Sequence, residues 1–441
     1  MNIGGIGVFL ALALLIVMAF KRWNLIIVSI LAALVVGITN RLGFWETLSD
    51  YFMPGAVNFF KSWFLVFTIG AMYSEFMTRS GSVTSIAYKL VDVFGKKYVI
   101  LIMLIICVLL NLGGINAYVQ IFILWPIMVV FSKESDIPRS IWLAVFYLGM
   151  LSSFSFPGNP SMVNTVAATL LSVSPSSSFI LSLIIFLVYV GIGYTYLALT
   201  VKRWKAKGMH YVETARDKNT TAVSRENCPG FAKSIVPMIL VLILYSGLSA
   251  GWFAALGIPA ISATNAILAS MAIASLVCFF LNFSSLKTEF KKIVCTGALG
   301  GINPTIMAGV ISGFVAVVTN SAAYAGFVAA VQNLGGHPYF QVLISGNVIS
   351  FLTGSAVVAA NTAMSSFGQA WLGAGISPEI LRPLLVVNVS GMSIPPHCGG
   401  LSGVMDFTGT DMKESYLPCV LGVMIPSLIT SILITVVMIL L

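Results

Sequence analysis

The most informative part of the sequence is Val389-Ser-Gly-Met-Ser-Ile-Pro-Pro-His-Cys-Gly-Gly-Leu-Ser-Gly-Val404, which interrupts a long apolar region near the C-terminus. A continuous helix cannot pass through Pro395 and Pro396, which remove backbone donors and clash with the preceding turn. Gly399, Gly400 and Gly403 are expected to loosen the backbone that follows. At membrane depth such a break persists only where protein buries it or where it lines a wet cavity. Secondary transporters place substrate and ions at breaks of this kind, so the stretch predicts a transport site.

The composition predicts an all-α polytopic membrane protein. Of the 441 residues, 58% are hydrophobic and only 8% are charged, whereas a soluble domain carries about 25% charged residues. The net charge of +9 therefore concerns membrane topology and does not indicate nucleic-acid binding. The six cysteines are scattered without a C-x-x-C pair, so no disulfide framework, metal site or cofactor is expected. The first apolar run, 3–20, lacks a basic region before it and is interpreted as a first span, not a signal peptide.

The chain divides into two halves with the same order of apolar runs. The N-terminal repeat, 1–201, has spans at 3–20, 24–39, 58–77 and 179–200 and interrupted runs at 98–131 and 140–172. A polar linker, 202–233, follows, and we expect it to be cytoplasmic. The C-terminal repeat, 234–441, has spans at 235–250, 258–282, 295–326 and 418–441 and interrupted runs at 339–372 and 382–410.

Two of the interrupted runs are predicted to be re-entrant hairpins. Each arm of 98–131 is too short for the ~20 residues that a helix needs to cross a bilayer, and basic residues flank this run on both sides. The run 339–372 is its counterpart in the second half. The expected fold has about ten transmembrane helices, these two hairpins, and broken helices at 140–172 and 382–410, arranged as two inverted-topology repeats.

The positive-inside rule supports this arrangement. With both termini outside, all Lys and Arg residues except Arg41, Lys61 and Arg382 fall on the cytoplasmic side. Treating each hairpin as two full spans gives the same parity, so the count supports the orientation without proving re-entrance. We therefore expect a multi-pass protein of the cell inner membrane, with its N- and C-termini periplasmic.

The four interruptions are expected to converge at the membrane midplane, where their small polar residues and freed backbone groups would form the site. Freed N–H groups at half-helix N-termini suit a carboxylate, and freed carbonyls suit Na⁺. The alternative is that the small residues only let helices pack closely. The candidate substrate-binding residues are Asn111, Gly113, Gly114, Asn116, Ser155, Gly158, Asn159, Ser161, Thr353, Gly354, Ser355, Asn361, Thr362, Ser393, Pro396, His397, Cys398 and Gly399.

Two ionisable residues are candidates for ion coupling. His397 is the only histidine placed in the membrane, and its side chain can carry a proton near physiological pH or stay neutral against a carbonyl. Asp406 lies either just inside the membrane or in solvent at the cytoplasmic end. No catalytic residue set accompanies them: paired carboxylates, a metal-ligand cluster or a nucleophile with its base are lacking, so the sequence does not predict an enzyme.

Short motifs resemble the gluconate permease (GntP) family. Ser393-Ile-Pro-Pro-His-Cys-Gly399 followed by Phe407-Thr-Gly-Thr-Asp-Met-Lys-Glu-Ser-Tyr416 is similar to that family's Asp-Thr-Leu-Pro-His-Asn-Gly and Val-Thr-Gly-Leu-Thr-His-Lys-Gln-Ser-Tyr. Gly354-Ser-Ala356 resembles its Gly-Ser-Ala, and Pro157-Gly-Asn-Pro160 resembles its Pro-Pro-His-Pro. The resemblance implies a bacterial inner-membrane symporter of sugar acids or other hydroxy acids, usually proton-coupled. It also implies, by analogy with the wider superfamily of carboxylate transporters, a homodimer with an elevator-type motion.

The chain departs from the family pattern at ionisable positions. Ser393 stands where the pattern has Asp, Asn159 where it has His, Tyr118 about where it has Asp and Ser350 where it has Arg, while His397 is kept. The main hypothesis is a symporter of small organic anions such as gluconate, driven by H⁺ or Na⁺. The alternatives are a carrier for a neutral or differently charged metabolite, and a non-transporting membrane protein.

Overall fold

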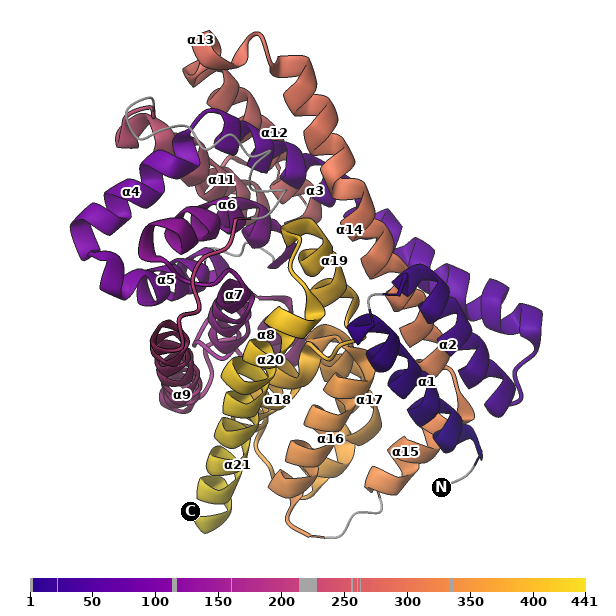
Figure 1. The fold of residues 1–441 in the computed structure, drawn as a ribbon. Coiled ribbons are helices and arrows are strands. Elements are labelled where there is room, and N and C mark those ends of the chain that lie inside the picture. Colours follow the sequence, from indigo (N-terminus) through magenta and orange to yellow (C-terminus); the bar gives the residue numbers. More distant parts are fainter. Residues whose placement is uncertain are drawn as a thin grey trace.

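The computed structural model describes residues 3–21, 23–112, 117–159, 161–213, 228–254, 257–259, 261, 263–332 and 336–441, and every regular element within them is a helix. The helices of the first half are α1 (Ile3–Phe20), α2 (Leu25–Thr39), α3 (Met53–Arg79), α4 (Ser82–Phe94), α5 (Val99–Leu112), α6 (Ala117–Ser135), α7 (Ser140–Ser153), α8 (Met162–Leu170) and α9 (Phe179–Ala206). Those of the second half are α11 (Phe231–Ala250), α12 (Ala263–Leu281), α13 (Phe283–Leu286), α14 (Phe290–Thr319), α15 (Ala322–Gln332), α16 (Pro338–Thr353), α17 (Ala356–Gly373), α18 (Pro378–Ser390), α19 (Gly399–Thr408), α20 (Met412–Cys419) and α21 (Ile425–Leu440). The predicted all-α class is confirmed (Figure 1).

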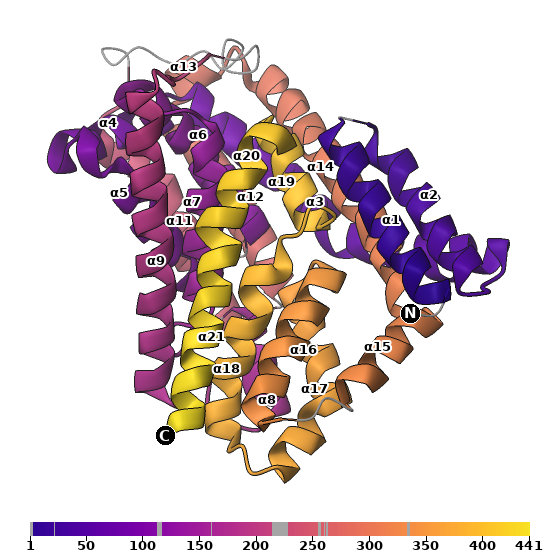
Figure 2. The same cartoon turned by 60° about the horizontal axis from the view of Figure 1, so that its bottom comes forward.

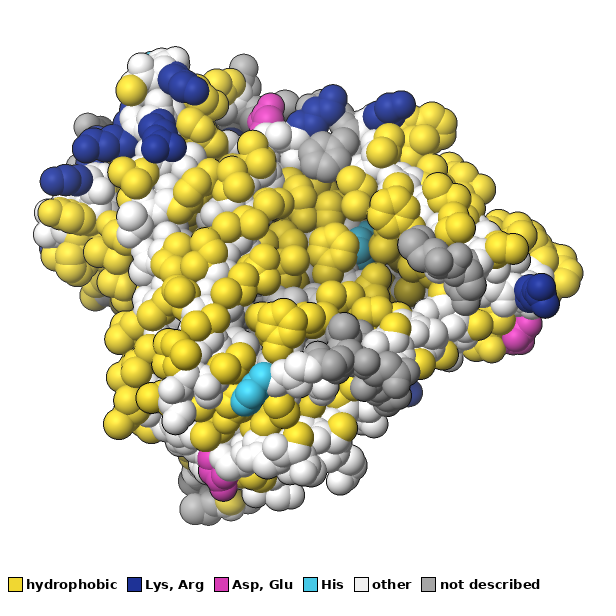
Figure 3. Space-filling view, turned by 90° about the horizontal axis from the view of Figure 1, so that it is seen from below, with side chains coloured by type: hydrophobic (Ala, Val, Ile, Leu, Met, Phe, Trp, Pro, Cys, Tyr) yellow, Lys and Arg dark blue, Asp and Glu magenta, His cyan; other side chains and the backbone are white. Residues whose placement is uncertain are grey.

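Several helices are suited to a lipid environment. Within the described residues, five helical segments are long and apolar enough to cross a membrane: Glu46–Arg79, Phe179–Ala206, Thr264–Leu281, Phe290–Thr319 and Met412–Leu440. Large apolar side chains are exposed on their outer faces, such as Ile180 and Phe280. Figure 3 shows hydrophobic side chains across the middle of one face and basic side chains gathered along its edge. The chain is therefore a multi-pass membrane protein, whereas the expected ten crossings stay a prediction.

The helices form two groups. An outer group consists of the hairpin α1–α2, the hairpin α11–α12 and the long helices α3 and α14, which pack along each other. An inner group consists of α5–α9 and α16–α21, in which the last long helices of the two halves, α9 and α21, run side by side next to α18 (Figure 2). The groups meet where α14 contacts α19 and where α3 contacts α6.

Glycines in α14 let its backbone approach that of α3. A Cβ atom built on Gly301 would lie 2.5 Å from the carbonyl oxygen of Phe67, and one on Gly297 would lie 2.6 Å from Cα of Met72. Both distances are too short for a real side chain, so no other residue fits without moving the helices apart. Small residues at such crossings are the usual means by which membrane helices pack closely.

Replacing Gly301 by alanine is therefore expected to destabilise the protein by about 1–3 kcal/mol, the cost of overpacking a close contact. Gly300→Ala is the matched control, because the Cβ there would have only the Cβ of Ala71 as a neighbour, at 3.8 Å. Thermal unfolding in detergent should show a lower midpoint for the first variant and an unchanged or higher one for the second, since alanine favours the helix. Equal shifts in both variants would contradict the close packing.

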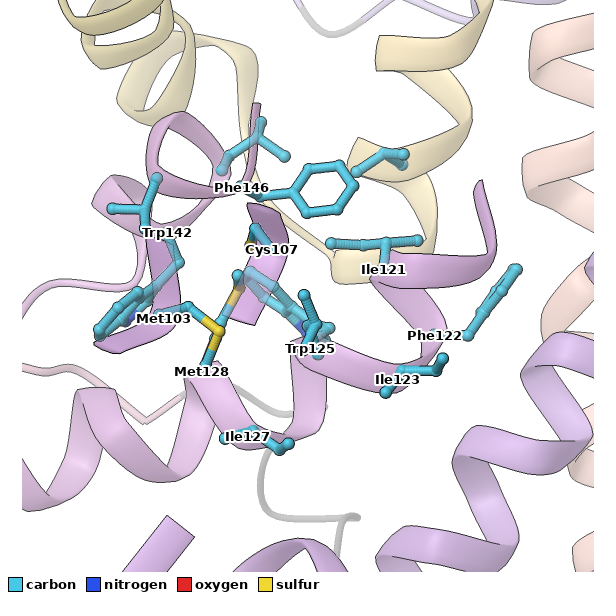
Figure 4. Packing of buried hydrophobic residues seen from close by; sticks show 14 of the residues in the cluster. Met103, Cys107, Ile121, Phe122, Ile123, Trp125, Ile127, Met128, Trp142 and Phe146 are labelled. Carbon is cyan, nitrogen blue, oxygen red and sulfur yellow. The ribbon is translucent and has the colours of Figure 1, made fainter. Parts of the chain in front are cut away.

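The inner group is built on buried apolar side chains. Figure 4 shows Met103 and Cys107 of α5, Trp125 and Met128 of α6, and Trp142 of α7 gathered in one cluster. Every residue of α7 from 141 to 153 is buried, so this helix lies at the centre of the inner group. A second cluster joins α16, α17 and α18 to α8.

Breaks separate α7 from α8, α16 from α17, and α18 from α19, as predicted, while 113–116 in the first hairpin lie outside the described residues. The break in the second hairpin is shorter than expected: it spans 354–355, and Asn361 and Thr362 lie inside α17. In the stretch 389–404, α18 ends at Ser390, one 3₁₀ turn follows, and α19 begins at Gly399. The expectation that Gly399, Gly400 and Gly403 loosen the backbone is wrong. All three lie in the first two turns of α19, because the prolines end before it and Cys398 caps it.

Helix α18 begins earlier than predicted, and this changes the position of Arg382. The run predicted to begin at Arg382 is part of a helix that starts at Pro378, with Ser377 as its N-cap. Arg382, expected on the periplasmic side, is therefore in the second turn of α18, and the residue is 0% exposed. The predicted span 295–326 is also divided, since α14 ends at Thr319 and α15 begins at Ala322.

Candidate functional site

A cavity of about 620 Å³ lies between the outer and inner groups. The outer group lines it with apolar and hydroxyl side chains of α3, α11, α12 and α14, including Phe59, Trp63 and Tyr245. The inner group lines it with residues from the helix breaks. Of the predicted site residues, those that line the cavity are Asn111, Ser161, Thr353, Gly354, Ser355, Ser393, Cys398 and Gly399. The structure thus brings residues of all four predicted interruptions to one place.

Three half-helices begin at this cavity. The N-cap residues of α8, α17 and α19 are Ser161, Ser355 and Cys398, and each cap side chain accepts a backbone N–H of the first turn at 3.4 Å. All three caps line the cavity, together with the first residues of each helix. Helix N-termini present unpaired N–H groups and a partial positive charge, so the cavity receives the positive ends of three helix dipoles.

The tip of the second hairpin contacts the start of α19. Gly354 has a left-handed backbone with φ of 58°, which ends α16 and turns the chain into α17. A Cβ on Gly354 would lie 3.1 Å from Cα of Cys398, so glycine permits both the turn and the close approach. Two of the three half-helix N-termini are thereby held next to each other.

The described lining of the cavity contains no Lys, Arg, Asp, Glu or His. A ligand there would meet hydroxyl and amide groups, backbone N–H groups and apolar walls. Among the described residues, no group of three or more His, Cys, Asp or Glu side chains lies together as a metal site would require. The described lining thus offers dipoles and hydrogen-bonding groups to a ligand.

A chain of buried amides runs from the cavity into the protein. Nδ2 of Asn159 donates to Oδ1 of Asn111 at 3.0 Å, and Nδ2 of Asn164 donates to the carbonyl oxygen of Asn159 at 2.9 Å. Oδ1 of Asn164 accepts from Nη1 of Arg382. All four side chains are at least 96% buried, with Asn111 the most exposed at 4%. Asn159 is thus beside the cavity as a supporting residue and does not itself line it.

The other predicted residues have different positions. Ser155, Gly158, Pro396 and His397 lie in the breaks but outside the cavity lining, as does Asp406 in α19. Asn361 and Thr362 border a separate hollow between α17 and α8. Gly113, Gly114 and Asn116 lie outside the described residues.

His397 connects the second broken helix to the second hairpin. Its ring is 1% exposed, and Nε2 lies 3.3 Å from the carbonyl oxygen of Leu352 in the last turn of α16. Because a carbonyl only accepts, Nε2 carries the proton and donates. Among the described residues, Nδ1 has no hydrogen-bond partner. The rings of Phe314 and Phe351 meet the imidazole edge-on.

Sequence reasoning missed Arg382 and the aromatic wall of the outer group. The signal for Arg382 was present in Ser377-Pro378-Glu379, which has the pattern of an N-cap followed by proline and an acid in the first turn. Reading it as a helix start would have placed Arg382 inside the helix. No comparable local signal marks Trp63 or Tyr245, since their faces are set by packing alone.

Comparison with known proteins agrees with this architecture. The model of the GntP family permeases matches residues 3–393 of the chain. The chain is also 23% identical, over 453 aligned positions and 93% of each chain, to a Bacillus subtilis (strain 168) protein described as "Uncharacterized transporter YxjC". Because the family match covers far more than half of the sequence, the chain belongs to the GntP permease family.

Proposed function

We propose that this permease is a secondary active transporter of small organic anions, such as a sugar acid or another hydroxy acid. The observation that carries the proposal is the meeting of three half-helix N-termini at one cavity whose described lining has no charged side chain. A carboxylate is the group that such N-termini bind best. Without a fixed cation, binding stays weak enough for release on the other side.

The driving ion is proposed to be H⁺ or Na⁺. For H⁺, the group that we assign is His397, because its Nδ1 has no partner and is able to accept a proton. Asp406, half-buried in α19, is the second candidate. For Na⁺, the ligands would be carbonyl and hydroxyl oxygens of the breaks.

A carrier for a neutral metabolite is the second candidate function. It is favoured by the absence of a cation from the described lining and by the departures Ser393 and Asn159, where the family pattern has Asp and His. Hydroxyl and amide groups would suit such a substrate as well. Competition separates the two: neutral analogues would compete for a neutral-metabolite site, and acids would compete for an anion site.

Uptake into proteoliposomes tests the proposal. Labelled gluconate, glycerate and lactate are offered with inward H⁺ and Na⁺ gradients imposed separately, and neutral amides of the same acids serve as competitors. Accumulation of an acid under either gradient is expected, and the effective gradient identifies the coupling ion. Failure to accumulate any of the acids under either gradient would contradict anion transport.

The mechanism that we propose is an elevator motion of the inner group against the outer group, in two inverted repeats. Three observations support it: the cavity lies between the two groups, α5 packs on α7 as α16 packs on α18, and α9 pairs with α21. Corresponding elements of the two halves thus make corresponding contacts, as inverted repeats require. Inner-membrane location with periplasmic termini, and assembly as a homodimer, stay predictions.

Hairpin accessibility checks this mechanism. Single cysteines along 111–118 and along 353–361 are expected to react with an impermeant maleimide in opposite fashion as the imposed gradient is reversed, because each hairpin gates its own side. The background replaces the other native cysteines and keeps exposed Cys295 as a labelling reference. Reactivity that rises and falls in parallel at both hairpins would contradict the alternating gates.

A further inference from the structure

Arg382 is a buried cation whose hydrogen-bond partners, in the part of the chain that the structure describes, are all neutral. Its Nε donates to Oγ of Ser177 at 2.8 Å, and Nη2 donates to Oγ of Ser182 at 2.7 Å and to the carbonyl oxygen of Ser177. Nη1 donates to Oδ1 of Asn164. Among the described residues no carboxylate forms an ion pair with it. A charge buried in this way is costly, so its placement in α18 against the first broken helix requires a reason.

The arginine fixes which way Asn164 faces. A guanidinium only donates, so the oxygen of the Asn164 amide must point to it. The nitrogen of the same amide then donates to two carbonyl oxygens, those of Asn159 at 2.9 Å and Pro175 at 3.2 Å. Asn164 thereby ties the break after α7 to the loop before α9.

The next amide is fixed by the backbone. Oδ1 of Asn159 accepts the backbone N–H of Ser161 at 2.6 Å, and its Nδ2 donates to the carbonyl oxygen of Ser153 at 2.5 Å. A backbone N–H can only donate and a backbone carbonyl can only accept, so the orientation of the Asn159 amide is fixed. Its Nδ2 therefore also faces Asn111. Oδ1 of Asn111 accepts a hydrogen bond from this Nδ2 at 3.0 Å. Asn111 lines the cavity and is left with its Nδ2 amide, a pure donor, to offer to a ligand.

We propose that this relay makes Asn111 a hydrogen-bond donor to the carboxylate of the substrate, with Arg382 as the positioning residue at its far end. The inference rests on the proposed anion transport and adds which side chain recognises the acid and what holds it. The polarity of the Asn159 and Asn111 amides follows from the backbone groups of Ser161 and Ser153, while Arg382 acts through Asn164 on the backbone carbonyl of Asn159 and so holds the break in place. A substrate group that accepts a hydrogen bond from Nδ2 of Asn111, such as a carboxylate, is therefore favoured. A substrate group that can only donate is disfavoured at that position.

Asn159→Asp tests the polarity. Aspartate has no donor, so the Asn111 amide must turn its nitrogen toward residue 159 and its oxygen toward the cavity. Binding of gluconate and lactate is expected to weaken by roughly 10- to 100-fold, the value of a hydrogen bond to a charged group. Binding of gluconamide and lactamide should stay equal or strengthen, because their NH₂ groups then meet an acceptor.

The matched control is Asn347→Asp. Asn347 is also buried, and its Nδ2 also donates to a neighbouring asparagine, Asn388, at 2.8 Å and to a carbonyl oxygen, that of Leu343, at 2.9 Å. It does not line the cavity. The preference for acid over amide should remain that of the wild type in this variant, whatever its stability.

Arg382 variants keep the proposal testable if Asn159→Asp does not fold. Arg382→Gln removes the donor that holds the Asn164 oxygen, so Asn164 holds the backbone of Asn159 less firmly and the contact between Asn159 and Asn111 loosens. KM for the acid should rise by roughly 10-fold and the acid-to-amide preference should fall, since the Asn111 amide is then less well oriented. A purely structural arginine would lower the amount of active transporter, and hence Vmax, without changing that preference. Arg382→Lys, which still donates to Asn164, should restore the preference in part.

The outcomes are distinguishable. Wild-type protein that accumulates neither gluconate, glycerate nor lactate contradicts the proposed function. Wild-type protein that takes up an acid, combined with parallel losses of acid and amide binding in Asn159→Asp and Arg382→Gln, overturns the relay and leaves anion transport standing.

Discussion

Replacing Ser355 by aspartate is expected to abolish the uptake of organic anions while leaving the fold intact. Ser355 is the N-cap of α17 and lines the cavity. Aspartate caps a helix as well as serine does, so the local structure should persist. The added carboxylate, however, neutralises the positive end of the helix where the substrate would bind. Two like charges about 4 Å apart repel by about 4 kcal/mol at an effective dielectric constant of about 20, which corresponds to nearly 1000-fold in affinity.

Ser355→Asn is the matched control, because asparagine caps equally well and has the shape of aspartate without its charge. Uptake by this variant should stay within about threefold of wild type, since only a hydrogen-bond geometry changes. Comparison of KM for a labelled acid among the three proteins gives the result, with thermal unfolding as a check on folding. An aspartate variant that transports the acid normally would place the substrate carboxylate elsewhere.

The breaks in the helices could be predicted because their causes are local. Pro395 and Pro396 end a helix by removing donors, and Gly354 allows the left-handed turn between α16 and α17. These rules need no knowledge of distant residues. The same local chemistry, applied to Ser377 and Pro378, would have moved the start of α18 and changed the interpretation of Arg382.

The relay could not be predicted, since it depends on contacts between residues far apart in the chain. Arg382 and Asn164 are separated by 218 positions, and Asn159 and Asn111 by 48. No periodicity or spacing indicates which of many buried asparagines will meet. The cavity wall formed by Trp63 and Tyr245 has the same origin, because packing of the outer group decides which faces of α3 and α11 turn inward.

The sequence pattern of helix α4 is weak, and its contacts with other helices account for its structure. The segment Ser82–Phe94 contains Lys89 and Asp92 and lies outside every apolar run of the sequence. Its apolar residues, Val83, Ile86, Ala87 and Val91, recur at helical spacing and are buried. The helix packs on α6 and α11 and bends by 107° into the first arm of the hairpin, α5.

His397→Gln is expected to remove proton-driven accumulation while keeping substrate exchange. The imidazole Nε2 donates to the carbonyl oxygen of Leu352, a contact that closes the second hairpin on the broken helix. The amide nitrogen of glutamine reaches a similar position and can still donate to that carbonyl. It cannot accept a proton, whereas the unpartnered Nδ1 of histidine can. Transport by exchange of internal for external substrate needs no net proton movement and should persist.

His397→Ala separates the two roles of the ring. Alanine leaves the Leu352 carbonyl without its donor and opens a space between Phe314 and Phe351. The protein should lose about 2–4 kcal/mol of stability from this cavity and the missing hydrogen bond. Both exchange and accumulation should therefore fall. Accumulation of labelled acid under an imposed pH gradient, compared with counterflow in the same vesicles, measures the two activities. If the glutamine variant accumulates the acid with an unchanged pH dependence, the histidine is a clamp between hairpin and broken helix, and the coupling proton must be carried elsewhere. If Na⁺ alone drives uptake in the wild type, the same variant should transport normally, because only the hydrogen bond to Leu352 is then required.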